Sequence, residues 1–297
     1  MVTVGSLAVK SFVSKDASLR DAAKVMVRSG IGGAAAIDEK GRLSFLVTDN
    51  DIANALARGE DPEVVKAIEY ATLSPLTVKP DVDALEALRI MKRYDISHLP
   101  VVENNKVLGI AYARDLVFAI LDHVPVGKAV IADSAKPLIE VSEDTKVSEA
   151  VTEMVRNDVE AVKVGNKLFT IRDMLHAVAE GEPYEDPVSK YANDKVIVTD
   201  ERSDLFCALS LMKSNKVEYL MLWNNKYVNV KDLAKVVPDI VKELLRFVIL
   251  SKKDVNIKGA IRTAGKYKAV IVVEGEDELR KVLDAIGGDV EVLVERG

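Results

Sequence analysis

The chain has 297 residues, of which 48% are hydrophobic and 30% charged, so it is long enough for two or three compact units with densely charged surfaces. Its formal net charge of −6 gives no overall basic field, which argues against nucleic acid as a partner. Cys207 is the only cysteine, which excludes intramolecular disulfides, and no apolar run reaches the ~18 residues that span a bilayer.

The first segment shows an order of elements that recurs along the chain. A strand opens it, and Asp16 to Ser18 can cap a helix over residues 19–29 whose apolar positions follow the spacing of one buried face. Two strands follow around a turn at residues 39–42, and a new helix begins at Asp49 to Asp51. The order is therefore strand, helix, strand, turn, strand and an Asp-led helix.

The second segment repeats this order. It predicts a strand over residues 74–78, a helix over 84–94 after the start signal Pro80-Asp81, and two strands over 98–102 and 106–113. An Arg-Asp pair then opens the next helix. The third and fourth segments follow with helices at 146–157 and 204–215, each flanked by short strands.

Two landmarks fix the repeat. Each first helix carries a late Met (Met26, Met91, Met154, Met212), and each closing helix starts at an Asp (Asp51, Asp115, Asp173, Asp232). The Asp-to-Asp intervals are 64, 58 and 59 residues, which makes chance an implausible source. Met-to-Asp spacing falls from 25 and 24 to 19 and 20 residues, so the last two copies are expected to have shorter strands or turns. Boundaries are placed to give units at 1–62, 63–125, 126–181 and 182–238.

The remainder, residues 239–297, does not repeat the pattern. Pro238 interrupts the preceding helix, and a new helix is expected over 239–250. A strand over 268–275, a helix over 276–288 and a strand over 289–295 then predict a small α/β appendix with no recognisable site.

The tandem units, with H-L-P-V-V and G-I-x-x-x-R-D-L in the second copy, resemble the CBS domain family over about residues 1–237. The resemblance implies an α/β fold in which each unit is a small sheet with two helices. It also implies that units pair sheet to sheet into Bateman modules with clefts for adenine nucleotides. Four copies imply two modules, an architecture similar to the gamma subunit of AMP-activated protein kinase.

The family's ribose-binding element is a Ser or Thr followed three residues later by Asp, whose carboxylate can accept hydrogen bonds from both ribose hydroxyls. The matching pairs are Thr48 with Asp51, Tyr112 with Asp115, Thr170 with Asp173, and Asn229 with Asp232. Asp51 and Asp173 keep both family positions, whereas Tyr112 and Asn229 depart from them. The alternative is helix capping alone, for which Asp at a helix start is also favoured.

Phosphate requires a cation, and bidentate geometry makes Arg114 and Arg172 the better candidates, with Lys231 and Lys136 as others. Their alternative is a surface salt bridge. The resemblance also places His98 beside the nucleotide, and Thr77 and Val78 along the adenine cleft. For each of these three residues the alternative is a purely structural role in the fold.

Two further features have competing interpretations. Gly30, Gly32 and Gly33 begin a small-residue strand, for which tight packing against the second unit is favoured over close approach to a ligand. Cys207 lies in an amphipathic helix and is expected to be a small core residue.

No P-loop, metal-ligand spacing or nucleophile–base pattern appears, so an enzyme is not expected.

The leading hypothesis is a cytoplasmic regulatory protein with no obligatory cofactor. AMP, ADP or ATP binding would shift the packing of the units, and a protein partner or the appendix would read out the shift. The alternative is a scaffold or interaction module whose clefts hold no ligand. A nucleotide-dependent transcription regulator would need a DNA-reading element, and no helix-turn-helix signature is present. Whether the chain forms a homodimer stays open.

Overall fold

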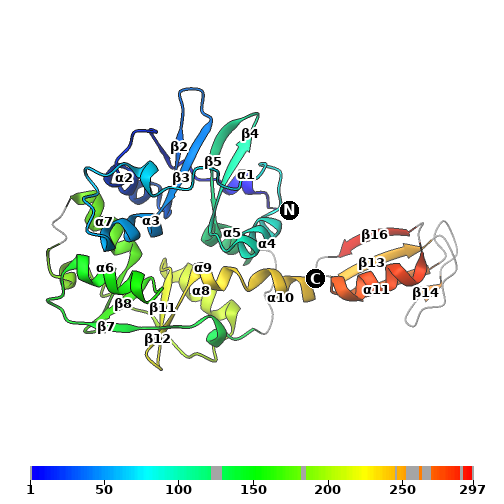
Figure 1. Cartoon of the computed structure of the whole chain (residues 1–297). Coiled ribbons are helices and arrows are strands. Elements are labelled where there is room, and N and C mark those ends of the chain that lie inside the picture. Colours follow the sequence, from blue (N-terminus) through cyan, green and yellow to red (C-terminus); the bar gives the residue numbers. More distant parts are fainter. Residues whose placement is uncertain are drawn as a thin grey trace.

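The computed structural model describes residues 2–121, 129–181, 185–244, 246–251, 261–262, 269–287 and 290–295. Within these ranges the repeated unit appears four times, and Figure 1 shows the first two units lying over the second two. The boundaries predicted at 125/126 and 181/182 involve residues 122–128 and 182–184, which lie outside the described ranges. No helix in the described ranges is long and apolar enough to cross a membrane.

The first unit forms a three-stranded sheet in which β1 pairs parallel with β2, and β2 antiparallel with β3. Its elements are α1 (Val4–Leu7), β1 (Phe12–Val13), α2 (Leu19–Ser29), β2 (Gly33–Ile37), β3 (Leu43–Thr48), α3 (Asp49–Ala57) and η1 (Ala67–Glu69). Helix α2 begins where the sequence predicts, because Ser18 and Asp21 form a capping box. Gly30 ends it in the left-handed conformation, with a φ of 73°.

The second unit contains α4 (Ala84–Tyr94), β4 (His98–Glu103), β5 (Lys106–Tyr112) and α5 (Ala113–Leu121). The strand predicted over residues 74–78 does not form as such, since only Val78 joins the sheet through a parallel bridge to Val101. Asp83, two residues after the predicted start signal, caps α4 by accepting a hydrogen bond from the Leu85 N–H.

The third and fourth units have the same order with shorter strands. The third unit contains η2 (Ile131–Ser134), β6 (Lys136–Pro137), β7 (Ile139–Val141), α6 (Val147–Arg156), β8 (Ala161–Val164), β9 (Lys167–Thr170), α7 (Ile171–Glu180) and η3 (Val188–Lys190). The fourth contains β10 (Val198–Thr199), α8 (Leu205–Asn215), β11 (Tyr219–Leu222), β12 (Lys226–Asn229) and α9 (Val230–Ala234).

Strands β9 and β12 have four residues each, against six in β3 and seven in β5, as the spacing predicted. The prediction of a core position for Cys207 is wrong, since its side chain is exposed on α8.

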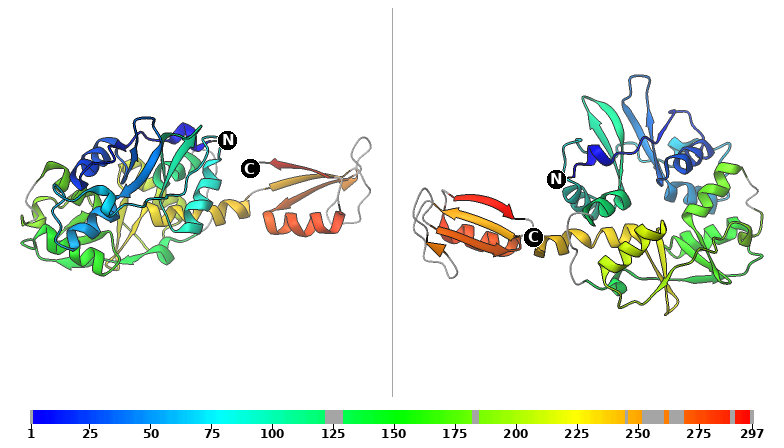
Figure 2. Two further views of the ribbon diagram at one scale, coloured as in Figure 1. Left: turned by 45° about the horizontal axis from the view of Figure 1, so that its top comes forward. Right: turned by 180° about the vertical axis from the view of Figure 1, so that it is seen from behind.

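Two kinds of contact hold the four units together. Units 1 and 2 meet through their sheets, where β2 lies against β5 around a cluster that includes Ala35, Ile110 and Tyr112. Units 1 and 3 meet through helices, α2 on α7 and α3 on α6, and units 2 and 4 through α5 on α8 and α9. The late Met of every first helix is buried in these cores. Both views in Figure 2 are consistent with this two-over-two arrangement.

The C-terminal part begins with α10 (Val237–Leu244), which has Pro238 in its first turn, where proline is tolerated. The prediction of one helix over 239–250 is wrong beyond residue 244. Residues 246–251 form β13 (Arg246–Ser251), which pairs with both β15 (Ala269–Glu274) and β16 (Val290–Glu295). Strand β14 (Ile261–Arg262) pairs with β15, and helix α11 (Glu276–Ile286) packs against the sheet. The sheet lies beyond the end of α10 (Figures 1 and 2).

Candidate functional site

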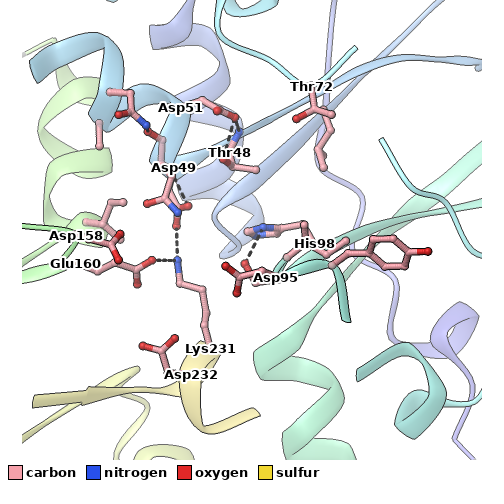
Figure 3. A pocket seen from close by; sticks show the side chains of 18 of the residues that line it. Thr48, Asp49, Asp51, Thr72, Asp95, His98, Asp158, Glu160, Lys231 and Asp232 are labelled. Carbon is pink, nitrogen blue, oxygen red and sulfur yellow. Dashed lines mark hydrogen bonds and ion pairs between the residues drawn. The ribbon is translucent and has the colours of Figure 1, made fainter. Parts of the chain in front are cut away.

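A cavity of about 610 Å³ lies where all four units meet. Its walls come from the start of α3, residues 94–98 ahead of β4, residues 154–160 ahead of β8, and the start of α9 (Figure 3). The volume falls within the roughly 300–1,000 Å³ of small-molecule sites. The site is therefore shared by both pairs of units.

The Thr48–Asp51 pair predicted from the first unit faces this cavity. Asp51 Oδ2 accepts hydrogen bonds from the backbone N–H of Thr48 at 2.7 Å and from its hydroxyl at 2.8 Å. Burial raises the pKa of Asp51 above its usual value, although the bonds from Thr48 oppose that shift. Thr48 and Asp51 form a capping box at the start of α3. These two residues therefore cap the helix, as the alternative interpretation predicted, and also line the cavity.

Lys231 from the fourth unit reaches into the centre of the molecule, as Figure 3 shows. Its Nζ lies 2.7 Å from Glu160 Oε1 and 3.3 Å from Asp49 Oδ2, and its side chain is 6% exposed. Burial alone would lower the pKa of Lys231, but the two carboxylates raise it well above its usual value. One buried ammonium group thus links units 1, 3 and 4.

Asp232, the predicted acid of the fourth unit, lines the outer part of the same cavity with two lysines. Lys136 Nζ lies 3.5 Å from Asp232 Oδ2, and Lys235 Nζ lies 2.6 Å from Asp95 Oδ1 and 3.7 Å from Asp232 Oδ1. The other half of the motif, Asn229, is buried and caps α9 by accepting from the Asp232 N–H. This unit therefore offers its carboxylate but not its amide to the cavity.

His98 is 4% exposed and lines the cavity. Its ring stacks on Tyr112 at 4.7 Å, Ser97 Oγ lies 3.3 Å from its Nδ1, and its Nε2 has no hydrogen-bond partner within the described part of the chain. Burial, with a contribution from Lys231, lowers the pKa of His98 to about 3, so the ring is neutral. This unpartnered Nε2 is itself buried and has no contact with solvent.

The glycines before β2 make room for these side chains. A Cβ on Gly33 would lie 2.8 Å from His98 Cδ2, and one on Gly32 would lie 2.2 Å from Asp49 Oδ2. The close contact of His98 with Gly33 agrees with the prediction that these glycines allow tight packing against the second unit. Gly32 in addition leaves room for the Asp49 carboxylate of the cavity.

The other predicted motifs gather in a second cluster around Glu218, which adjoins the cavity where His98 stacks on Tyr112. Glu218 Oε1 lies 2.6 Å from Arg114 Nη1 and 3.0 Å from Arg172 Nη2, and Glu218 Oε2 accepts a hydrogen bond from the Tyr112 hydroxyl at 2.9 Å. Both arginines also donate to the carbonyl of Gly30. Burial would raise the pKa of Glu218, but Arg172, Arg114 and Tyr112 together lower it.

Two more predicted acids belong to this second cluster. Arg114 donates from Nε to Asp115 Oδ1 at 2.8 Å, and Thr170 forms a capping box with Asp173. Burial raises the pKa of both Asp115 and Asp173. The structure thus divides the four motifs, with units 1 and 4 at the cavity and units 2 and 3 at the Arg–Glu218 cluster.

Two further predicted residues lie outside both the cavity and the Arg–Glu218 cluster. Thr77 is exposed and Val78 packs in the core, while Thr72, Ser74 and Pro75, a few positions earlier, line the wall. The sequence interpretation also missed Glu160 and Glu218. Each precedes the first strand after the Met-bearing helix, a position that an alignment of the four copies would have shown to be acidic in two of them.

The model of the CBS domain family matches residues 9–58 and 65–122, and these two segments therefore belong to the CBS domain family. Arabinose 5-phosphate isomerase KdsD from Yersinia pestis is 31% identical over 107 residues, 36% of this chain and 33% of the isomerase. The chain thus spans about a third of the length of that relative.

Among solved structures, protein MJ1225 from Methanocaldococcus jannaschii, proposed to be an archaeal homologue of the AMP-activated protein kinase gamma subunit, is similar with a TM-score of 0.62. It is 18% identical, and the match covers 79% of this chain and 99% of that one, which shows a shared fold across the four units. The CBS domain protein PAE2072 from Pyrobaculum aerophilum, solved with AMP, is 28% identical over 40% of this chain and 95% of that one, with a TM-score of 0.37.

Proposed function

We propose that this CBS-domain chain is a regulatory protein that binds an adenine nucleotide in the cavity shared by its four units. The observation that carries the proposal is the placement of Thr48 and Asp51 on the wall of a cavity of about 610 Å³. The same wall includes His98, a neutral ring whose buried Nε2 has no partner among the described residues. A carboxylate that can accept from ribose hydroxyls, beside an uncharged ring, is a suitable recognition group for a nucleoside.

AMP, ADP and ATP are the candidate ligands, and repacking of the units is the proposed action. All four units contribute to the wall, so a ligand that fits one arrangement of the pairs better than another would shift their equilibrium. A protein partner or the C-terminal sheet would then read out the change. We infer a regulatory role in preference to catalysis, because each ammonium group of the cavity already has a carboxylate partner.

A scaffold role is the second candidate, and the Arg–Glu218 cluster favours it. There Arg114 and Arg172, the predicted phosphate ligands, already hold a carboxylate of the same chain. Ion pairs of this kind fix the position of units 2, 3 and 4 without any ligand.

The test is calorimetric titration of the full chain with AMP, ADP and ATP, with Asp51→Ala and Asp173→Ala as matched variants. Both replacements remove a capping box, but only Asp51 lines the cavity. We expect Asp51→Ala to abolish the binding heat and the ligand-induced rise in melting temperature, and Asp173→Ala to keep both. No heat and no thermal shift at millimolar nucleotide would overturn the proposal, as would equal losses in the two variants.

A further inference from the structure

Glu160 occupies a position that recurs in all four units. It stands immediately before β8, where the other units have Gly32, Ser97 and Glu218. In each unit the carbonyl of this residue accepts a hydrogen bond from the first residue of the closing helix, which confirms that the positions are equivalent. Units 3 and 4 therefore carry a carboxylate where units 1 and 2 carry none.

The cations that would meet phosphate also occupy equivalent positions. Arg114, Arg172 and Lys231 are each the second residue of a closing helix. Glu218 forms ion pairs with both arginines, and Glu160 forms one with Lys231. Every one of these three cations is thus bound by a glutamate from the second pair of units.

The remaining charges of the cavity strengthen this pattern. Its lining includes six carboxyl groups (Asp49, Asp51, Asp95, Asp158, Glu160, Asp232) and three ammonium groups (Lys136, Lys231, Lys235). Each ammonium group already has a carboxylate oxygen within 4 Å. Phosphate adds about 1.5 to 2 negative charges to a ligand at neutral pH, and it would enter a site with a surplus of acids.

We propose that Glu160 is a specificity-determining residue that keeps Lys231 from the phosphates of a ligand. The inference rests on the proposed function and deepens it. The cavity binds the adenosine part through Asp51 and His98, and affinity falls as phosphates are added, from AMP to ADP to ATP. Glu160 sets this order because it neutralises the buried ammonium group at the centre of the cavity.

The experiment titrates the full chain with adenosine, AMP and ATP by calorimetry, without divalent cations. It compares the natural chain, Glu160→Gln and the control Glu140→Gln, which removes an exposed carboxylate paired with Lys163 at 3.3 Å. The amide in Glu160→Gln retains an oxygen for the Asn229 and Tyr219 donors that now reach Glu160 Oε2. The natural chain is expected to bind adenosine or AMP at least tenfold more tightly than ATP. Glu160→Gln should narrow that ratio at least tenfold, and Glu140→Gln should leave it unchanged.

The natural chain alone decides the main point, even where Glu160→Gln fails to fold. ATP binding as tightly as AMP, or more tightly, would overturn the selectivity while leaving the proposed function intact. An unchanged ratio in a folded Glu160→Gln chain would remove Glu160 from its assigned role. A chain that binds none of the three compounds would overturn the proposed function and this inference with it.

Discussion

The cavity and the Arg–Glu218 cluster are built from equivalent positions of the same repeat, yet they differ in how their charges are held. In the cluster, one carboxylate that is 12% exposed serves two arginines, with Tyr112 as a further donor. In the cavity, one lysine that is 6% exposed is shared by two carboxylates, and two further lysines lie towards the rim. The first arrangement ties two arginines to one acid, and the second lines a cavity of about 610 Å³.

The difference follows from single residues at repeated positions. Units 2 and 3 place arginine at the second position of the closing helix, and the long planar guanidinium groups converge on Glu218 and the Gly30 carbonyl. Units 1 and 4 place Asn50 and Lys231 there, and Asn50 is on the cavity wall. Unequal side chains on an approximately equal backbone thus distinguish an ion-pair cluster from a cavity wall.

Replacing Glu218 is expected to have the largest effect on stability. Glu218→Gln removes the carboxylate that bridges Arg114 and Arg172 and leaves two partly buried guanidinium groups poorly neutralised, with Asp115 as the remaining partner of Arg114. Breaking a buried ion pair on one side typically costs about 3–5 kcal/mol in the free energy of unfolding. Urea unfolding followed by circular dichroism measures this change.

The matched variant is Glu160→Gln, in which Lys231 keeps Asp49 as a partner at 3.3 Å. Its loss of unfolding free energy should be clearly smaller than that of Glu218→Gln. Equal losses would show that the two regions are not held differently.

Gly32→Ala should cause the next largest loss of stability, this time at the cavity. The added Cβ would lie 2.2 Å from Asp49 Oδ2 and 2.7 Å from its Cγ, so Asp49 must leave its position beside Lys231. Overpacking of this kind costs about 1–3 kcal/mol in the free energy of unfolding. Chemical denaturation of the variant and the natural chain measures the loss.

A double-mutant cycle identifies the cause of that loss. In an Asp49→Ala background the clashing carboxylate is absent, so Gly32→Ala should then have little further effect. Additive losses would mean that the clash with Asp49 is not the reason.

The sequence predicted the repeat well because its signals are local. Apolar spacing marks the first helices, Ser18 caps α2 within the predicted start, and the cap of α4, Asp83, lies two residues after the predicted Pro80-Asp81 signal. The shortened spacing correctly indicated the four-residue β9 and β12. The helix predicted over 239–250 failed beyond Leu244. There a short apolar run, Phe247 to Leu250, fits a strand as well as a buried helix, and pairing with β15 and β16 decides it.

The location of the site could not be predicted in the same way. Thr48, Asp51, Asp232 and His98 were all named as ligand candidates, but their assembly into one cavity depends on how units 1 and 3 and units 2 and 4 pack, which no single unit encodes. The same contacts bring Glu160 to Lys231 and Glu218 to the arginines. In a chain with 47 Asp and Glu, neither glutamate stood out until those neighbours were known.

His98 gives the cavity a pH dependence of its own. Because burial lowers its pKa to about 3, the folded chain keeps His98 neutral where the unfolded chain, with a pKa near 6.5, binds a proton. The unfolded state therefore gains stability as the pH falls below about 6.5, and His98 should account for about 2 kcal/mol of lost unfolding free energy between pH 6.5 and pH 5. Urea unfolding at a series of pH values measures this slope.

His98→Gln should flatten that slope, whereas His176→Gln, at an exposed position, should leave it as it is. Identical slopes in the natural chain and His98→Gln would show that another group causes the acid sensitivity.

Lys235→Gln, at the rim of the cavity, should have the smallest effect on the free energy of unfolding. The partner of Lys235, Asp95, has a side chain that is 85% exposed, and such pairs contribute about 0–1 kcal/mol and are screened by salt. Urea unfolding at low and high salt should show a loss below about 1 kcal/mol that disappears at high salt. A pair held this weakly can rearrange around a ligand at little cost, whereas moving Glu218 would break its ion pairs with two partly buried arginines. A salt-independent loss as large as that of Glu218→Gln would mean that the cavity rim is as rigid as the cluster, and would argue against ligand-driven repacking at the cavity.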